Sequence, residues 1–176
     1  MAALNKPAML IRPECPADAQ RIRDLTTRAF NGMPYSDGSE PGIIDALRRT
    51  EALTLSLVAE VDGVLVGQIT FSPVTIDGRH DHWFGLGPVS VDPRRQKAGI
   101  GSALINEGLK RMKETGAKGI VLVGDPLYYQ RFGFEGAVGL SYAGIDPHYV
   151  QRIVMALPDR QGTVRYTDAF EDAAAG

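Results

Sequence analysis

Cysteine and long apolar runs are scarce in this chain of 176 residues. Its one cysteine, Cys15, excludes a disulfide within the chain and a cysteine-rich zinc site, so we expect no metal site. A chain without disulfides suits a reducing compartment, which favours a cytoplasmic protein. Apolar runs such as residues 120–123 are far shorter than the ~20 residues of a membrane helix. Residues 1–7 lack the pattern of a signal peptide, so no membrane partner is expected.

An excess of positive charge is also absent. Lysine and arginine number 19 against 21 aspartate and glutamate, which gives a formal net charge of −2. Nucleic-acid binding needs clustered basic surface, so we expect no nucleic-acid partner. The composition is globular, with 44% hydrophobic residues, and the length fits one domain, residues 1–176. We place the core at about 9–157 and expect frayed tails at 1–7 and 168–176.

Hydrophobic spacing predicts an α+β fold. Residues 9–12 form a short apolar run typical of a strand, and two helical patterns follow, after Pro16 and near Ser39. From Thr54 the apolar residues alternate, and two Asp-Gly pairs mark hairpin turns. These features predict a three-stranded antiparallel meander that ends with a strand at 83–91.

A strand–loop–helix–strand unit follows the meander. A polar loop leads from Val91 to a helix that begins around Ile100 and ends near Gly116, and residues 119–123 predict a buried strand. Such a βαβ unit places its two strands parallel to each other, so the central sheet is expected to be mixed. A short helix capped by Asp125 and further strands complete the chain.

Two glycines, Gly99 and Gly101, stand where the polar loop meets this helix. The first N–H groups of a helix have no partner within it, and the helix dipole places about half a positive charge there. Glycine lets a phosphate approach that backbone closely. The spacing indicates an anion site, and it also fits an ordinary glycine-containing loop.

A dinucleotide-dependent oxidoreductase is a remote alternative reading of the same loop. Gly99 and Gly101 open the dinucleotide pattern, and Asp125 lies near the distance expected of its ribose carboxylate. The third glycine position, however, is Leu104, and a long polar loop replaces the tight turn. No Gly-Lys-Ser/Thr string is present, which excludes a P-loop.

Residues 91–104 resemble the acetyl-CoA-binding motif of the GNAT N-acetyltransferases, which runs Val-x-Pro-x-x-Gln/Arg-x-x-Gly-x-Gly/Ala. Residues 128–134 resemble the Tyr-x-x-x-Gly-Phe ending of the same family. The order of elements agrees over roughly 9–157, and the strings at 86–88 and 124–126 further resemble an uncharacterised bacterial branch of small N-acetyltransferases. The resemblance implies a GNAT-type fold, a mixed sheet splayed between its two central parallel strands, and acetyl-CoA as acetyl donor.

The resemblance also implies which residues bind this cofactor. The backbones of Val89 and Val91 would pair with the pantetheine arm, and Arg94, Arg95 or Lys97 would meet the 3′-phosphate unless they form a solvated loop. Pyrophosphate would be held by the backbone of Gln96, Lys97, Ala98, Gly99, Ile100, Gly101 and Ser102.

Tyr129 matches the general-acid position of the family, and its neighbour Tyr128 is the competing assignment. A phenol with a pKa of about 10 is suited to protonating a departing thiolate. The backbone N–H of Val89 is the expected polariser of the thioester carbonyl. The strand at 84–88 lacks the carboxylate that often serves as general base, so the base stays unassigned. The remaining candidates are Glu40, Glu60, His80, His82 and Asp125.

We therefore expect an acetyl-CoA-dependent N-acetyltransferase that moves an acetyl group to a primary amine by direct attack in a ternary complex. A non-catalytic acyl-CoA-binding or regulatory module is the alternative, favoured by the missing carboxylate and opposed by Tyr129. The acceptor is a small-molecule or peptide amine that the sequence does not specify, and a homodimer is left open.

Overall fold

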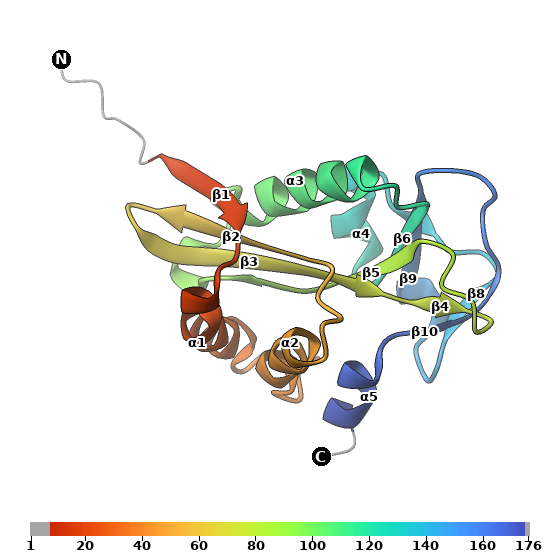
Figure 1. The fold of residues 1–176 in the computed structure, drawn as a ribbon, viewed down its shortest axis with the longest axis horizontal. Helices are drawn as coiled ribbons and strands as arrows, with labels where there is room; N and C mark the ends of the chain where they lie inside the picture. The colour runs from red at the N-terminus through yellow and green to blue at the C-terminus, as the bar shows by residue number, and fades with distance from the viewer. Residues whose placement is uncertain (1–7, 175–176) are drawn as a thin grey trace.

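The computed structural model describes residues 8–174, which fold around a seven-stranded mixed sheet (Figure 1). Its strand order is β1-β2-β3-β5-β6-β9-β7. A smaller sheet has the order β4-β10-β8. The strands of the large sheet are β1 (Met9–Pro13), β2 (Leu55–Val61), β3 (Val64–Pro73), β5 (Trp83–Val91), β6 (Gly119–Val123), β9 (Val150–Val154) and β7 (Glu135–Gly136). Those of the small sheet are β4 (Thr75–Ile76), β8 (Leu140–Tyr142) and β10 (Gly162–Arg165).

Helices cover both faces of the large sheet (Figure 1). One face carries α1 (Ala19–Phe30) and α2 (Glu40–Arg49), and the other carries α3 (Ile100–Glu114) and the short α4 (Pro126–Tyr129). On β3, Ile69 and Phe71 pack into the core beneath α3, as the alternation of strand side chains requires. Among the described residues, no helix combines the length and apolar character needed to cross a membrane.

The expected meander is confirmed, because β2, β3 and β5 pair antiparallel in sequence order. The expected βαβ unit is confirmed as well, since β5 and β6 are parallel and joined through α3. Their pairing covers only three residue pairs, the last of which joins Gly85 to Val121. Beyond that point β5 continues beside β3 and β6 continues beside β9. The two central strands therefore part, as expected of the splayed sheet.

The expected frayed tail at 168–176 is wrong for most of its length. Asp168–Ala174 forms helix α5, and Ala169 is buried against Ile43 and Leu47 of α2. Tyr166 is also buried, so the core extends beyond residue 157. The sequence of α5 offers only a few apolar residues, and its helix is stabilised by the surface on which it packs. Residues 1–7 and 175–176 lie outside the described part of the chain.

Candidate active site

The loop between β5 and α3 is shaped by Asp92. Its side chain is 3% exposed and accepts the N–H of Arg94 at 3.0 Å, which caps a short 3₁₀ turn, Pro93–Arg95. Lys97 and Gly99 then adopt positive φ angles of +62° and +83°, and α3 begins at Ile100. The reversal at Gly99 brings the chain directly into the first turn of α3, where backbone N–H groups lack helical partners.

The edge of β5 next to this loop offers backbone groups to a ligand. The Asp92 N–H donates to Val66 O on β3 at 2.8 Å. Because backbone groups alternate along a strand, the N–H groups of Val89 and Val91 point to the opposite side, away from β3. On that side the pairing with β6 has already ended at Gly85. The two groups therefore face the gap between the parted strands.

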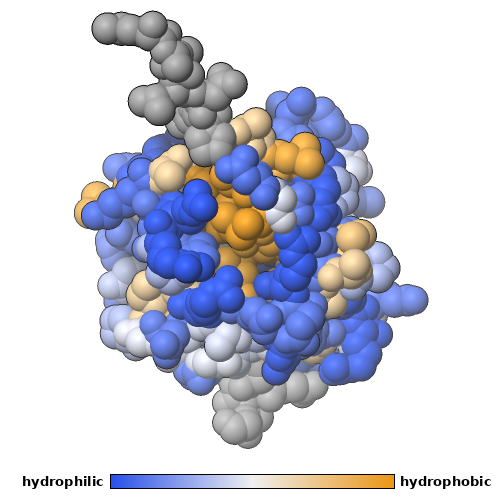
Figure 2. Space-filling view, turned by 90° about the vertical axis from the view of Figure 1, so that its left-hand side faces the viewer, coloured by the Kyte–Doolittle hydropathy of each residue, from blue (hydrophilic) through white to orange (hydrophobic). Residues whose placement is uncertain are grey.

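An apolar hollow lies on the side of the molecule where β5 ends and α3 begins. That side is the left in Figure 1 and faces the viewer in Figure 2, which shows apolar surface in a hollow surrounded by hydrophilic residues. The chemistry fits a ligand with an apolar or amide-bearing arm and an anionic end, because the helix start lies beside the hollow.

Tyr129 is the last residue of α4 and packs over Gly124, just beyond the end of β6. A Cβ on Gly124 would lie 2.5 Å from Tyr129 Cε2, so the ring needs glycine there. Burial, with smaller contributions from the phenols of Tyr128 and Tyr35, raises the pKa of Tyr129 to about 12. Tyr35 belongs to the loop that joins α1 to α2.

Tyr128 takes a different direction from Tyr129. Its hydroxyl lies 3.3 Å from the position that a Cβ on Gly101 would occupy, at the start of α3. Its ring also carries the guanidinium of Arg131, whose Cζ lies 4.6 Å from the ring centroid. Sequence reasoning left Tyr128 as an alternative acid or a packing residue and did not single out Arg131. The adjacent aromatic pair and the arginine three residues later were the available signals.

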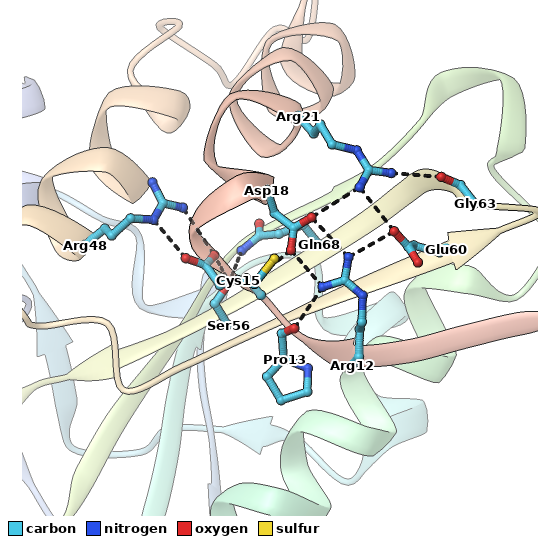
Figure 3. A network of polar contacts seen from close by, with 11 residues as sticks. Arg12, Pro13, Cys15, Asp18, Arg21, Arg48, Ser56, Glu60, Gly63 and Gln68 are labelled. Carbon is cyan, nitrogen blue, oxygen red and sulfur yellow. Dashed lines mark hydrogen bonds and ion pairs between the residues drawn. The ribbon is translucent and has the colours of Figure 1, made fainter.

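Most of the proposed general bases are engaged elsewhere. Glu60 accepts from Arg12 at 2.9 Å and from Arg21 at 3.2 Å, which holds its pKa below the usual range (Figure 3). Asp125 caps α4 by accepting the N–H of Leu127 at 2.9 Å. The remaining three candidates lie as follows: His80 contacts Val74 O in a turn, His82 is exposed beside His80, and Glu40 accepts from Ser36 at 2.8 Å.

The loop cations also differ from one another. Arg94 is bound by Asp92 through two contacts of 3.1 and 3.2 Å, and Arg28 of α1 reaches the same carboxylate at 3.6 Å. Arg95 and Lys97 are exposed. Arg94 is thus committed to the loop itself, whereas the other two are free to turn toward a ligand.

A pocket of about 260 Å³ lies at the end of α1 and the start of α2. Its wall includes Phe30, whose ring packs edge-on against Tyr35 at 6.5 Å, so the pocket adjoins the loop that joins α1 to α2. Glu40 is its one charged lining residue. The lining residues are Thr27, Phe30, Asn31, Gly32, Ser36, Gly38, Glu40 and Pro41.

Comparison with known proteins adds independent findings. The model of the acetyltransferase (GNAT) domain matches residues 11–137. The uncharacterised N-acetyltransferase YhbS of Escherichia coli K12 is 41% identical over 128 residues, which cover 72% of this chain and 74% of YhbS.

Two solved structures are similar over nearly the whole chain. A GNAT family acetyltransferase from Brucella melitensis, in complex with acetyl-CoA, superposes with a TM-score of 0.85 at 48% identity and covers 94% of this chain and 99% of its own. YhbS from Escherichia coli in complex with CoA gives a TM-score of 0.89 at 33% identity, with 97% and 96% covered. The chain therefore belongs to the GNAT family of acetyltransferases.

Proposed function

We propose that this protein transfers the acetyl group of acetyl-CoA directly to a primary amine, with Tyr129 as the general acid. The observation that carries the proposal is the position of Tyr129 beside the end of β6, where β5 and β6 have parted. Its pKa of about 12 keeps the phenol protonated at neutral pH, as a proton donor must be.

The cofactor site of the proposal follows the loop and the free edge of β5. Gln96, Lys97 and Ala98 precede the glycine turn, and their backbone with that of Gly99, Ile100, Gly101 and Ser102 would hold the pyrophosphate. The N–H and C=O groups of Val89 and Val91 would pair with the amides of pantetheine as an added strand does. The complexes of the two similar proteins with acetyl-CoA and CoA support this assignment.

The chemistry balances with these groups and solvent. The neutral amine attacks the thioester carbonyl, whose oxygen accepts a hydrogen bond from the N–H of Val89. The carbon–nitrogen bond forms and the carbon–sulfur bond breaks, and the departing thiolate takes the proton of Tyr129. The acceptor nitrogen loses one proton to solvent before it attacks and a second one from the tetrahedral intermediate, and water returns a proton to Tyr129.

The pocket at Glu40 is the proposed place of the acceptor. It adjoins the loop of Tyr35, and its lining adds hydroxyl and amide groups to one carboxylate. A carboxylate without a lining cation attracts an amine in its ammonium form. A small-molecule or peptide amine fits this description.

Replacing Tyr129 by phenylalanine tests the proposal. The change removes one hydroxyl and keeps the ring, so we expect kcat to fall ~10²-fold while CoA affinity and the melting temperature stay unchanged. Thiol release from acetyl-CoA is measured with a panel of amines. Tyr149→Phe is the matched control, since Tyr149 is a half-exposed residue of the 3₁₀ turn Pro147–Tyr149.

Two results would contradict the proposal. Undiminished kcat in Tyr129→Phe would show that solvent protonates the thiolate. Tight CoA binding by the wild type without turnover on any amine would instead indicate the non-catalytic module.

A further inference from the structure

The start of α3 lies beside α4 and the turn that follows α4. The Tyr128 hydroxyl lies next to Gly101. Val91 of β5 lies next to the same glycine, and its Cγ2 is 3.6 Å from the position that a Cβ on Gly101 would occupy. Arg131 lies on the outer face of the Tyr128 ring. Segments that are separated by a helix and a strand in the sequence therefore meet at one helix start.

Arg131 is held in place without being neutralised. In the described part of the chain its polar and cation–π contacts are both to Tyr128: Nε donates to Tyr128 O at 2.8 Å, and the guanidinium stacks on the ring. Its side chain is exposed, and the two terminal nitrogens are left to donate. An arginine fixed in this way presents a planar fork that matches the geometry of a phosphate.

We propose that Arg131, held on the ring of Tyr128, binds a phosphate group of CoA, and that the Tyr128 hydroxyl donates a hydrogen bond to the same anionic end of the cofactor. The inference rests on the proposed function, because it takes CoA as the ligand at the start of α3. It separates the roles of the two adjacent tyrosines: Tyr128 serves cofactor binding and Tyr129 serves catalysis.

The charge balance at the helix start favours this assignment. The helix dipole supplies only about half a positive charge, whereas the pyrophosphate and the 3′-phosphate of CoA carry several negative charges. Arg94 is already paired with Asp92, so it offers little further charge. Arg131 supplies a full charge beside Tyr128, whose hydroxyl lies at the helix start, and its stack on Tyr128 reduces the entropy lost when phosphate binds.

The test measures CoA binding by calorimetry rather than turnover. We expect Arg131→Ala to raise the Kd of CoA about 10-fold and Arg131→Lys to raise it less, because lysine keeps the charge but loses the fork and the stack. Arg49→Ala is the matched control: it removes an equal charge from the exposed end of α2, and CoA affinity should not change.

Dephospho-CoA identifies the phosphate. If Arg131→Ala weakens CoA but leaves dephospho-CoA unchanged, the partner is the 3′-phosphate; equal losses for both ligands assign it to the pyrophosphate. Either result supports the proposal. Tyr128→Leu should reproduce most of the loss, and adding Arg131→Ala to it should cost little more, because the arginine then lacks its platform.

Wild-type affinity for CoA in Arg131→Ala would overturn the inference and leave the proposed function standing. Failure of the wild type itself to bind CoA would instead overturn the proposed function. Melting temperatures of all variants are compared, and a loss of affinity in a variant that melts with the wild type cannot be a folding defect. Independent losses in Tyr128→Leu and Arg131→Ala, adding fully in the double variant, would refute the stacked pair.

Discussion

At the residue scale, Asp18 is a buried carboxylate with several donors, outside the proposed cofactor site. Asp18 is 1% exposed, accepts from Arg12 at 2.7 and 3.0 Å and from the Cys15 N–H at 2.8 Å, and meets Arg21 at 3.2 Å (Figure 3). These donors hold the pKa of the carboxyl well below its usual range. The cluster joins the start of α1 to β1 and, through Glu60, to β2. It therefore fixes one of the two helices that border the proposed acceptor pocket.

Asp18→Asn should lower the free energy of unfolding by about 2 kcal/mol, because it leaves Arg12 without its main partner. A lowered pKa in the folded state stabilises the protein above the unfolded value of about 3.9, and this contribution is lost as the pH falls below it. The difference in free energy of unfolding between the wild type and Asp18→Asn, measured in urea, should accordingly become smaller from pH 5 to pH 3. Asp24→Asn, an exposed change on α1, is the control. An advantage that does not vary with pH would refute the assigned ionisation.

At the element scale, regular patterns were readable and short or context-dependent elements were not. The Asp-Gly turns and the alternation in β2 and β3 predicted the meander, and the glycine at 116 predicted the end of α3. The strands β4 and β10 escaped notice because two and four residues carry too little periodicity. For the proposed site, the motifs predicted the loop and Tyr129. Successive helical side chains point about 100° apart, so the separate directions of Tyr128 and Tyr129 required the packing of α4 against Gly101 and Gly124.

The first turn of α3 yields a prediction about cofactor binding. Gly101→Val places a branched side chain where a Cβ would already lie 3.3 Å from the Tyr128 hydroxyl, and it fills the space beside the first N–H groups. We expect CoA affinity to fall at least ~10-fold while the protein stays folded. Gly42→Val in α2 is the control, since a Cβ there meets no atom within 4 Å. Unchanged affinity in Gly101→Val would move the phosphate site elsewhere.

At the scale of the whole molecule, the C-terminal segment joins parts that are distant in the sequence. Strand β10 pairs with β4 and β8, and α5 packs on α2. Between them, Tyr166 fills the space over Gly85, where a Cβ would lie 2.2 Å from the ring. This is the point at which β5 and β6 cease to pair. The segment thus contacts both the helix next to the proposed acceptor pocket and the base of the parted strands.

Ala169→Glu should lower the free energy of unfolding by about 3 kcal/mol, because it places a charge in the buried contact between α5 and α2. Denaturant unfolding measures the change. Ala143→Glu, in an exposed turn, should leave stability within about 0.5 kcal/mol of the wild type. Equal stability of the two variants would show that the contact between α5 and α2 does not stabilise the fold, as expected of a frayed tail.

The position of Tyr166 also has a consequence for the order in which the protein is completed during synthesis. The ribosome makes the chain from its N-terminus, so β5, α3 and β6 emerge well before the residue that covers Gly85. Trp83 and Val121, which share a buried cluster with Tyr166, lack its cover until this residue has been made. The face beneath α3 can fold while synthesis continues, whereas the part of the opposite face that Tyr166 covers closes only after this residue has been made. A chain that stops before Tyr166 would therefore contain the whole loop between β5 and α3, but it would expose the apolar surface around Gly85, where the two strands part.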